Sequence, residues 1–251
     1  MRAEEFITKI SEKTGDEQSL KILRGQIPLG IDAYGEIVCA QTREHLYTAQ
    51  HTCVTGGRRT ECIWRILLTL ACLYDRSEVN FLILSPRAEY GELLKLQGVD
   101  ITVPFVRTKK DVEDGILCVK ELLSLYAQGK GFPKLILVLD GLEDLEKNGE
   151  NFRGDLEEYR NVFDLLAREK NVQVISGVDL IKSIFSGNPG VFVGVGNCLV
   201  TTREEGKADV TKVGEDCSLS LPTAIEYPQA PSITETVIML NSIMAKQGKG
   251  E

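Results

Sequence analysis

The chain has few histidines and no closely spaced pair of cysteines. It contains two histidines and seven cysteines in 251 residues. Neither a C-x-x-C pair nor a zinc-type spacing with the histidines is present. Cys39, Cys53 and Cys198 lie within apolar runs, where a reduced cysteine behaves as a small hydrophobic residue. This usage predicts neither a zinc site nor a disulfide framework, and it favours a reducing compartment.

Long hydrophobic runs and a basic charge balance are also missing. No apolar run approaches the ~20 residues that a bilayer-spanning helix needs, and the acidic, polar N-terminus does not follow the signal-peptide pattern. We therefore expect a cytoplasmic protein without direct membrane insertion. The formal charge of -8 argues against a generally basic nucleic-acid surface, although it is compatible with local basic loops.

Short apolar runs alternate with amphipathic segments along most of the chain. Runs that are apolar throughout predict strands that are covered on both faces, which is typical of a parallel sheet with helices on each side. We predict strands at 36–40, 52–55, 80–84, 134–139, 172–176 and 198–202. We predict helices at about 60–72, 109–127, 155–170 and 232–246, a short helix near residue 89, and a helical turn at 180–185. Residues 25–35 and 222–231 are predicted to be turns and connections, because they are rich in glycine or proline.

The domain organisation follows from these patterns. Residues 1–24 are polar with a weak helical stripe, which predicts an N-terminal helical extension. Residues 25–251 contain no internal repeat or low-complexity segment, and their length suits one large domain. The fold class predicted from the sequence is therefore α/β.

The segment 51–72 has the layout of a phosphate-binding loop. A short apolar strand is followed by a double-glycine turn and then by an amphipathic helix. The residues that would contact a nucleotide are those of the turn and the first helical residues: Gly56, Gly57, Arg58, Arg59 and Thr60.

The loop residues differ from those of a working P-loop, G-x-x-x-x-G-K-[ST]. If Gly56 is the first glycine, the second glycine, lysine and hydroxyl places fall on Glu61, Cys62 and Ile63. If Arg59 and Thr60 instead stand for the lysine and the hydroxyl residue, the loop is three residues too short. Two interpretations stay open: an anion-binding loop, and a plain strand-to-helix connection with two solvated arginines.

A second motif ends the most hydrophobic strand. The sequence LILVLDGLEDL from 135 to 145 places Asp140 after a buried run, as in a Walker B motif whose aspartate supports Mg²⁺. Asp140 is thus the candidate metal ligand. The next position, where ATPases often carry a glutamate base, is Gly141, which has no side chain to act in acid–base catalysis. The alternative role for Asp140 is a helix cap or turn residue.

The order of these motifs resembles the motor domain of the FtsK/SpoIIIE DNA-translocase family, which includes the type VII secretion ATPases. The matching segments are PLGIDAYGEIV at 28–38, HTCVTG at 51–56, Ser85-Pro86-Arg87, Asp140 with Asp144-Leu145, and 167–179. The resemblance implies a RecA-like P-loop NTPase fold with a mostly parallel sheet and helices on both faces. It also implies ring assembly, ATP and Mg²⁺ as cofactors, and Arg168 as a candidate trans-acting arginine.

Four positions of this family pattern are changed. The P-loop lysine and glycines are missing, the Walker B glutamate is Gly141, Ser85 replaces an aspartate, and Val178-Asp179 replaces a polar sensor pair. Because preorganised donors and a metal ion supply most of the stabilisation in phosphoryl transfer, such losses predict little turnover.

Three functional hypotheses result. The first is a degenerate FtsK/SpoIIIE-like ATPase domain, with altered Walker A and Walker B motifs, that binds or regulates within a DNA- or protein-translocating assembly. Its partner would be a protein, another copy in a ring, or DNA. The second is a divergent but active ATP-dependent DNA translocase in which Arg59 replaces the lysine. The third is a DNA-binding module with no nucleotide role, which the acidic balance makes the weakest.

Overall fold

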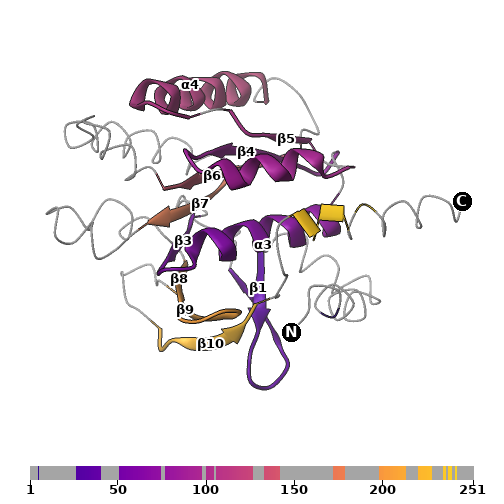
Figure 1. Ribbon diagram of the computed structural model, residues 1–251, viewed down its shortest axis with the longest axis vertical. Coiled ribbons are helices and arrows are strands. Elements are labelled where there is room, and N and C mark those ends of the chain that lie inside the picture. The colour runs from indigo at the N-terminus through magenta and orange to yellow at the C-terminus, as the bar shows by residue number, and fades with distance from the viewer. Residues whose placement is uncertain are drawn as a thin grey trace, which may run out of the picture.

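The computed structural model describes about half of the chain (Figure 1). The described residues are 5, 27–40, 51–74, 77–97, 100–104, 106–126, 133–141, 172–178, 198–212, 220–227, 234–235, 237–238 and 241. The predicted helix at 155–170, the turn at 180–185, the extension at 1–24 apart from Glu5, and Arg168 lie outside these residues. The described residues of the predicted 232–246 helix are helical.

One sheet of ten strands organises the molecule, in the order β2-β1-β10-β9-β8-β3-β7-β6-β4-β5. The strands are β1 (Ile27–Ile31), β2 (Ile37–Ala40), β3 (His51–Thr55), β4 (Val79–Leu84), β5 (Asp100–Thr102), β6 (Lys134–Asp140), β7 (Val172–Val178), β8 (Cys198–Thr202), β9 (Lys207–Lys212) and β10 (Thr223–Glu226). From β8 to β5 the six strands are parallel, and from β9 to β2 each strand is antiparallel to its neighbour.

Helices cover both faces of the parallel part, as predicted. Helix α3 (Arg59–Leu73) shares a buried cluster with Phe81 and Ile83 of β4. The next residue, Leu84, points to the opposite face, because side chains alternate along a strand. There it meets helix α4 (Lys109–Tyr126), where a Cβ at Gly115 would lie 2.7 Å from a Leu84 methyl. The α/β fold with a mostly parallel, two-sided sheet is therefore confirmed.

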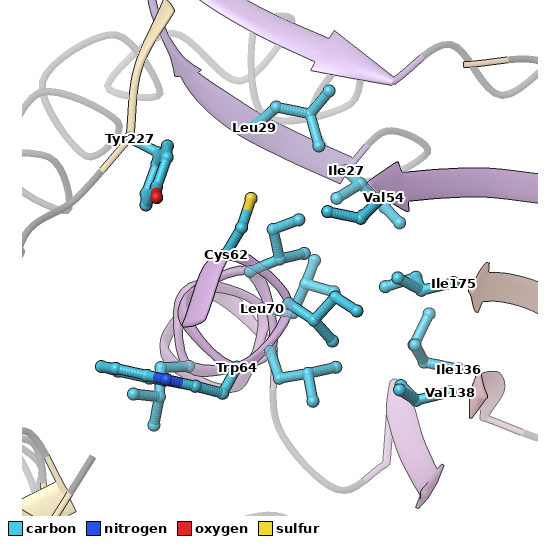
Figure 2. Close-up of a cluster of buried hydrophobic side chains, with 14 of the residues drawn as sticks. Ile27, Leu29, Val54, Cys62, Trp64, Leu70, Ile136, Val138, Ile175 and Tyr227 are labelled. Atoms are coloured by element: carbon cyan, nitrogen blue, oxygen red, sulfur yellow. The ribbon is translucent and has the colours of Figure 1, made fainter. Parts of the chain in front are cut away.

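The main core lies between α3 and the sheet (Figure 2). Apolar residues of the helix at helical spacing pack against one face of the sheet, which contributes Val54, Ile136 and Ile175 among others. Ile63 and Leu67 of α3, with Ile136 of β6, are each 1% exposed or less. This packing holds the helix, and with it the preceding glycine turn, in a fixed position above the sheet.

The strand predicted at 36–40 is present as β2, but two predictions for its neighbours in the antiparallel part were wrong. Residues 25–35 were expected to form turns, but Ile27–Ile31 is a fully buried strand. Residues 222–231 were expected to be a connection, but Thr223–Glu226 is a strand. The strands β5 and β9 were also not predicted. The short helix near residue 89 is present as a 3-10 helix, η1 (Ala88–Lys95).

No helix within the described residues is long and apolar enough to cross a membrane.

Candidate functional site

The turn between β3 and α3 is short and closely packed. It consists of residues 56–58, since β3 ends at Thr55 and α3 begins at Arg59. Gly56 has a φ of 100°, in the left-handed region where L residues are strained. A Cβ at Gly56 would also lie 2.5 Å from the Thr202 carbonyl oxygen. The turn therefore requires glycine at this position, both for its conformation and for its contact with β8.

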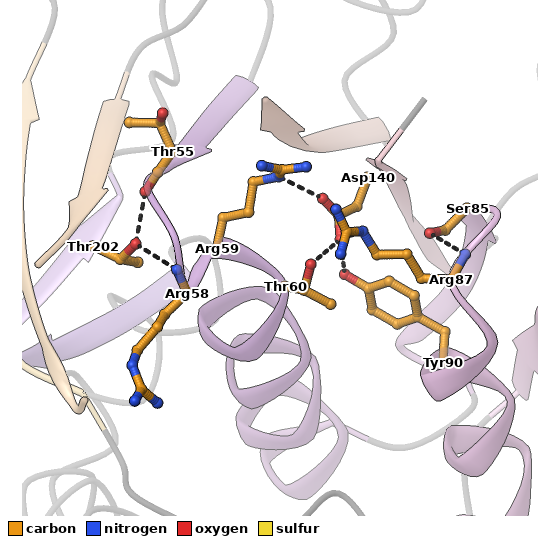
Figure 3. A network of polar contacts seen from close by, with 9 residues as sticks. All are labelled: Thr55, Arg58, Arg59, Thr60, Ser85, Arg87, Tyr90, Asp140 and Thr202. Carbon is orange, nitrogen blue, oxygen red and sulfur yellow. Dashed lines mark hydrogen bonds and ion pairs between the residues drawn. The ribbon is translucent and has the colours of Figure 1, made fainter. Parts of the chain in front are cut away.

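Two backbone amides at the end of this turn, those of Arg58 and Arg59, are engaged within the protein (Figure 3). The Arg58 N–H donates to Thr202 Oγ1 at 3.3 Å, and that hydroxyl donates to the Thr55 carbonyl at 2.9 Å. The Arg59 N–H donates to the Gly56 carbonyl at 3.3 Å. A phosphate-binding loop instead directs successive N–H groups at the anion.

Asp140 is the centre of a buried polar network at the carboxyl end of the sheet. Its side chain is 0% exposed. Asp140 Oδ1 accepts a hydrogen bond from Arg59 Nε at 3.1 Å. Asp140 Oδ2 accepts from Thr60 Oγ1 at 2.6 Å and from the Tyr90 hydroxyl at 2.9 Å. Arg87 Nε lies 3.4 Å from the same oxygen. Figure 3 shows these four side chains converging on the carboxylate.

Two glycines make room for this network. A Cβ at Gly177, on the neighbouring strand β7, would lie 2.7 Å from the Asp140 carboxyl carbon. A Cβ at Gly141 would lie 2.5 Å from Arg87 Nε. The absence of a side chain at Gly141 thus provides the space that Arg87 occupies.

The charges of the network are unusual for a metal site. Two guanidinium groups, of Arg59 and Arg87, lie against one carboxylate. Burial, and then the nearby Asp140 carboxylate, raise the pKa of Tyr90 well above its usual value. Tyr90 therefore stays a neutral hydrogen-bond donor. A Mg²⁺ ion at Asp140 would face two positive groups at close range.

Arg58 points away from Asp140. Its guanidinium pairs with Glu61 at 2.9 Å and lies 3.9 Å from Glu205 in the β8–β9 turn. Glu61 also pairs with Arg65, whose guanidinium lies 5.3 Å from the centre of the Tyr227 ring. These ion pairs connect the start of α3 to the antiparallel strands.

The structure brings some of the predicted site residues together. Asp140, Arg59 and Thr60 are in direct contact. This contact supports the alignment in which Arg59 and Thr60 stand for the lysine and the hydroxyl residue. Gly56, Gly57 and Arg58 form the adjacent turn, and Arg168 lies outside the described residues.

Sequence reasoning missed two contributors, Tyr90 and Thr202, and gave Arg87 no role at the site. The sequence contained a signal for Arg87 and Thr202. Arg87 follows β4 and Thr202 ends β8, and ligands of parallel sheets bind at the carboxyl ends of the strands. Tyr90 had no such signal, because it lies within η1 and the sequence does not show in which direction this helix packs on the sheet.

The described residues offer no alternative metal centre, and several of their thiols are deeply buried. Among them, no three His, Cys, Asp or Glu side chains are grouped to hold a metal ion. Burial raises the pKa of Cys53 to about 11 and of Cys62 and Cys198 to about 12. These thiols stay protonated and unreactive near neutral pH, which for Cys53 and Cys198 agrees with their interpretation as small hydrophobic residues.

Comparisons with known proteins show which solved structures have a similar fold. No family model matches the sequence, and no curated protein matches it. Solved structures do match. EssC (ATPases 2 and 3) from Geobacillus thermodenitrificans has a TM-score of 0.55 at 13% identity, over 88% of this chain and 50% of that one. The cytoplasmic domain of the type VII secretion ATPase EccC from Thermomonospora curvata has a TM-score of 0.55 at 14% identity, over 87% and 31%.

The conjugation coupling protein TcpA of pCW3, solved as a monomer with ATPγS, has a TM-score of 0.54 at 12% identity, over 89% of this chain and 71% of that one. The chain thus spans half or less of the length of the two secretion proteins. At these identities the likeness concerns the fold, which is α/β and RecA-like, similar to P-loop ATPases of secretion and conjugation.

Proposed function

We propose that this chain is a degenerate FtsK/SpoIIIE-like domain, with little or no ATP hydrolysis, that acts as a binding or regulatory subunit of a DNA- or protein-translocating assembly. One observation carries the proposal: Arg59, at the place of the P-loop lysine, donates to the Walker B-like Asp140. In an active site of this kind the lysine reaches the nucleotide phosphates and the aspartate supports Mg²⁺.

The residues present do not suit Mg²⁺-ATP. Both oxygens of Asp140 accept hydrogen bonds, from Arg59 and from Thr60 and Tyr90. Arg87 adds a second positive charge beside them. A Mg²⁺ ion would have to displace or repel these groups. Two of the amides that could otherwise bind a phosphate, those of Arg58 and Arg59, are already bonded within the protein.

The missing catalytic groups support the same conclusion. Gly141 has no side chain that could activate water, and Arg87 lies where such a side chain would begin. The relatives in fold are named as a secretion ATPase and a conjugation coupling protein. A role beside an active ATPase subunit would use the shared scaffold without requiring turnover from this chain.

A divergent, active ATP-dependent DNA translocase is the alternative. The Thr60–Asp140 contact favours it, because a P-loop hydroxyl and a Walker B aspartate bind the same Mg²⁺ ion in active enzymes. The alternative requires Arg59 to leave Asp140 and reach a phosphate. Arginine is not a conservative replacement for lysine there, since its guanidinium is planar and rigid.

Calorimetric titration with Mg²⁺-ATP, together with a turnover assay, tests the proposal. We expect neither saturable binding nor turnover above a buffer blank. The divergent ATPase would instead show saturable binding that Arg59→Ala abolishes and Arg58→Ala, the matched control on the outward-facing arginine, preserves. Turnover at rates typical of enzymes, on the order of 1–1,000 per second, would refute the proposal.

A further inference from the structure

The start of helix η1 belongs to the network around Asp140 (Figure 3). The Tyr90 hydroxyl donates to Asp140 at 2.9 Å, and Arg87, the residue before the helix, lies beside the same carboxylate. Tyr90 and Leu93 of η1 are each 0% exposed and belong to the main core. The position of η1 therefore determines whether Tyr90 covers Asp140.

The end of η1 is bonded by the side chain of a residue far away in the sequence, Asn241. Asn241 Nδ2 donates to the Lys95 carbonyl, and Asn241 Oδ1 accepts from the Gln97 N–H, each at 2.9 Å. Lys95 is the last residue of η1, and carbonyl groups at the end of a helix lack a partner within it. This pairing uses both the donor and the acceptor of the amide side chain.

Two further residues of the same segment face η1. Thr234 Oγ1 donates to Glu92 Oε2 at 2.9 Å, and Val237 is 2% exposed within the main core. Thr234, Val237 and Asn241 follow the spacing i, i+3 and i+7, which places them on one face of a helix. The segment thus contacts η1 through one helical face.

Few apolar side chains hold this segment in place. Of its five described residues, Val237 is the one buried apolar residue, whereas Ile238 is 62% exposed. Helix α3, by contrast, buries apolar residues along most of its length. Elements with few buried apolar contacts open locally at a lower free energy than the core. The segment can therefore separate from η1 while α3 and the sheet stay folded.

We propose that the segment 234–241 is a latch on η1: while it is docked, Tyr90 covers Asp140, and its release lets η1 move and uncovers the carboxylate. Asn241 and Thr234 are then positioning residues that act on Asp140 through η1. The proposal does not depend on whether the Asp140 site binds nucleotide, because it concerns the position of η1 alone.

Nitration by tetranitromethane, measured for each tyrosine by peptide mass spectrometry, tests the latch on the full chain. In the parent, Tyr34, which is 90% exposed, should react while Tyr90 is protected. In Asn241→Ala we expect nitration of Tyr90, relative to Tyr34, to rise about ten-fold, because two hydrogen bonds that oppose local opening are lost. Tyr227, 1% exposed, reports on global unfolding and should stay protected.

A matched control separates the latch from a general loss of hydrogen bonding. Ser124→Ala on α4 also removes a side-chain hydrogen bond to a backbone carbonyl, at 2.7 Å, and should leave Tyr90 protected. Thr234→Ala should raise Tyr90 nitration by a smaller factor, and it repeats the test if circular dichroism shows that Asn241→Ala does not fold.

Three results would overturn the proposal. The first is unchanged nitration of Tyr90 in the folded latch variants. The second is an equal rise at Tyr227, which would mean that the substitutions loosen the whole fold and not η1. The third is an equal rise at Tyr90 in Ser124→Ala.

Discussion

The carboxylate of Asp140 is fully buried beside two guanidinium groups, and this arrangement determines what the residue can do. A buried ion pair is not a large net source of stability, because desolvation opposes the Coulombic attraction. Its energetic importance appears when one partner is removed, since the other charge is then buried without compensation. Asp140 is better suited to holding α3 and η1 against β6, through Arg59 and Tyr90, than to exchanging ligands.

We predict that Asp140→Asn lowers the free energy of unfolding by about 3 kcal/mol, because the guanidinium of Arg59 loses its buried counter-charge. Urea-induced unfolding measures this change. Asp114→Asn, an exposed acid on α4, should change stability by less than about 0.5 kcal/mol. Equal stability of the Asp140 variant and the control would show that the network is not structural.

The turn between β3 and α3 is the element in which conformation and packing constrain the sequence most strongly. Gly56 combines a positive φ with close approach to Thr202. Gly57 has neither constraint, since nothing lies within 4 Å of a Cβ built there. The two neighbouring glycines therefore form a matched pair for testing how rigid the turn is.

Gly56→Ala is expected to destabilise the protein by about 1–3 kcal/mol, through backbone strain and the clash with Thr202. Gly57→Ala should be close to neutral. Thermal unfolding of the two variants provides the comparison. If both variants melt at the temperature of the parent, the turn adapts easily and the described geometry does not constrain it.

The elements that could be predicted are those with a strong hydrophobic signal. The buried runs at 80–84 and 134–139 and the amphipathic helix after Thr60 were all found, because burial on both faces or on one helical stripe leaves a clear pattern. Strand β1 was missed since Pro28 and Gly30 suggest a turn. In the fold, Gly30 instead allows β1 to approach the Glu226 carbonyl closely.

The candidate site could be predicted only in part. Asp140 and the glycine turn have motif signatures, so their positions were found. The contact between Arg59 and Asp140 joins residues 81 positions apart, and Tyr90 reaches Asp140 across 50 positions. Such pairs depend on the strand order, in which β7 separates β3 from β6. A single sequence does not specify this order.

At the scale of the whole molecule, the chain combines a RecA-like parallel sheet with an antiparallel extension. The parallel part carries the polar network around Asp140, and the extension consists of β9, β10, β1 and β2. The end of β8 and the turn that follows it connect the two, because Thr202 accepts a hydrogen bond from the Arg58 N–H and Glu205 lies near the Arg58 guanidinium.

A crystal structure determined with saturating Mg²⁺-ATPγS is the most direct test of the central claim. We predict that Arg59 still donates to Asp140 and that no nucleotide is bound at residues 56–60. A structure in which Arg59 has turned to the phosphates, with Mg²⁺ bound at Thr60 and Asp140, would contradict the account.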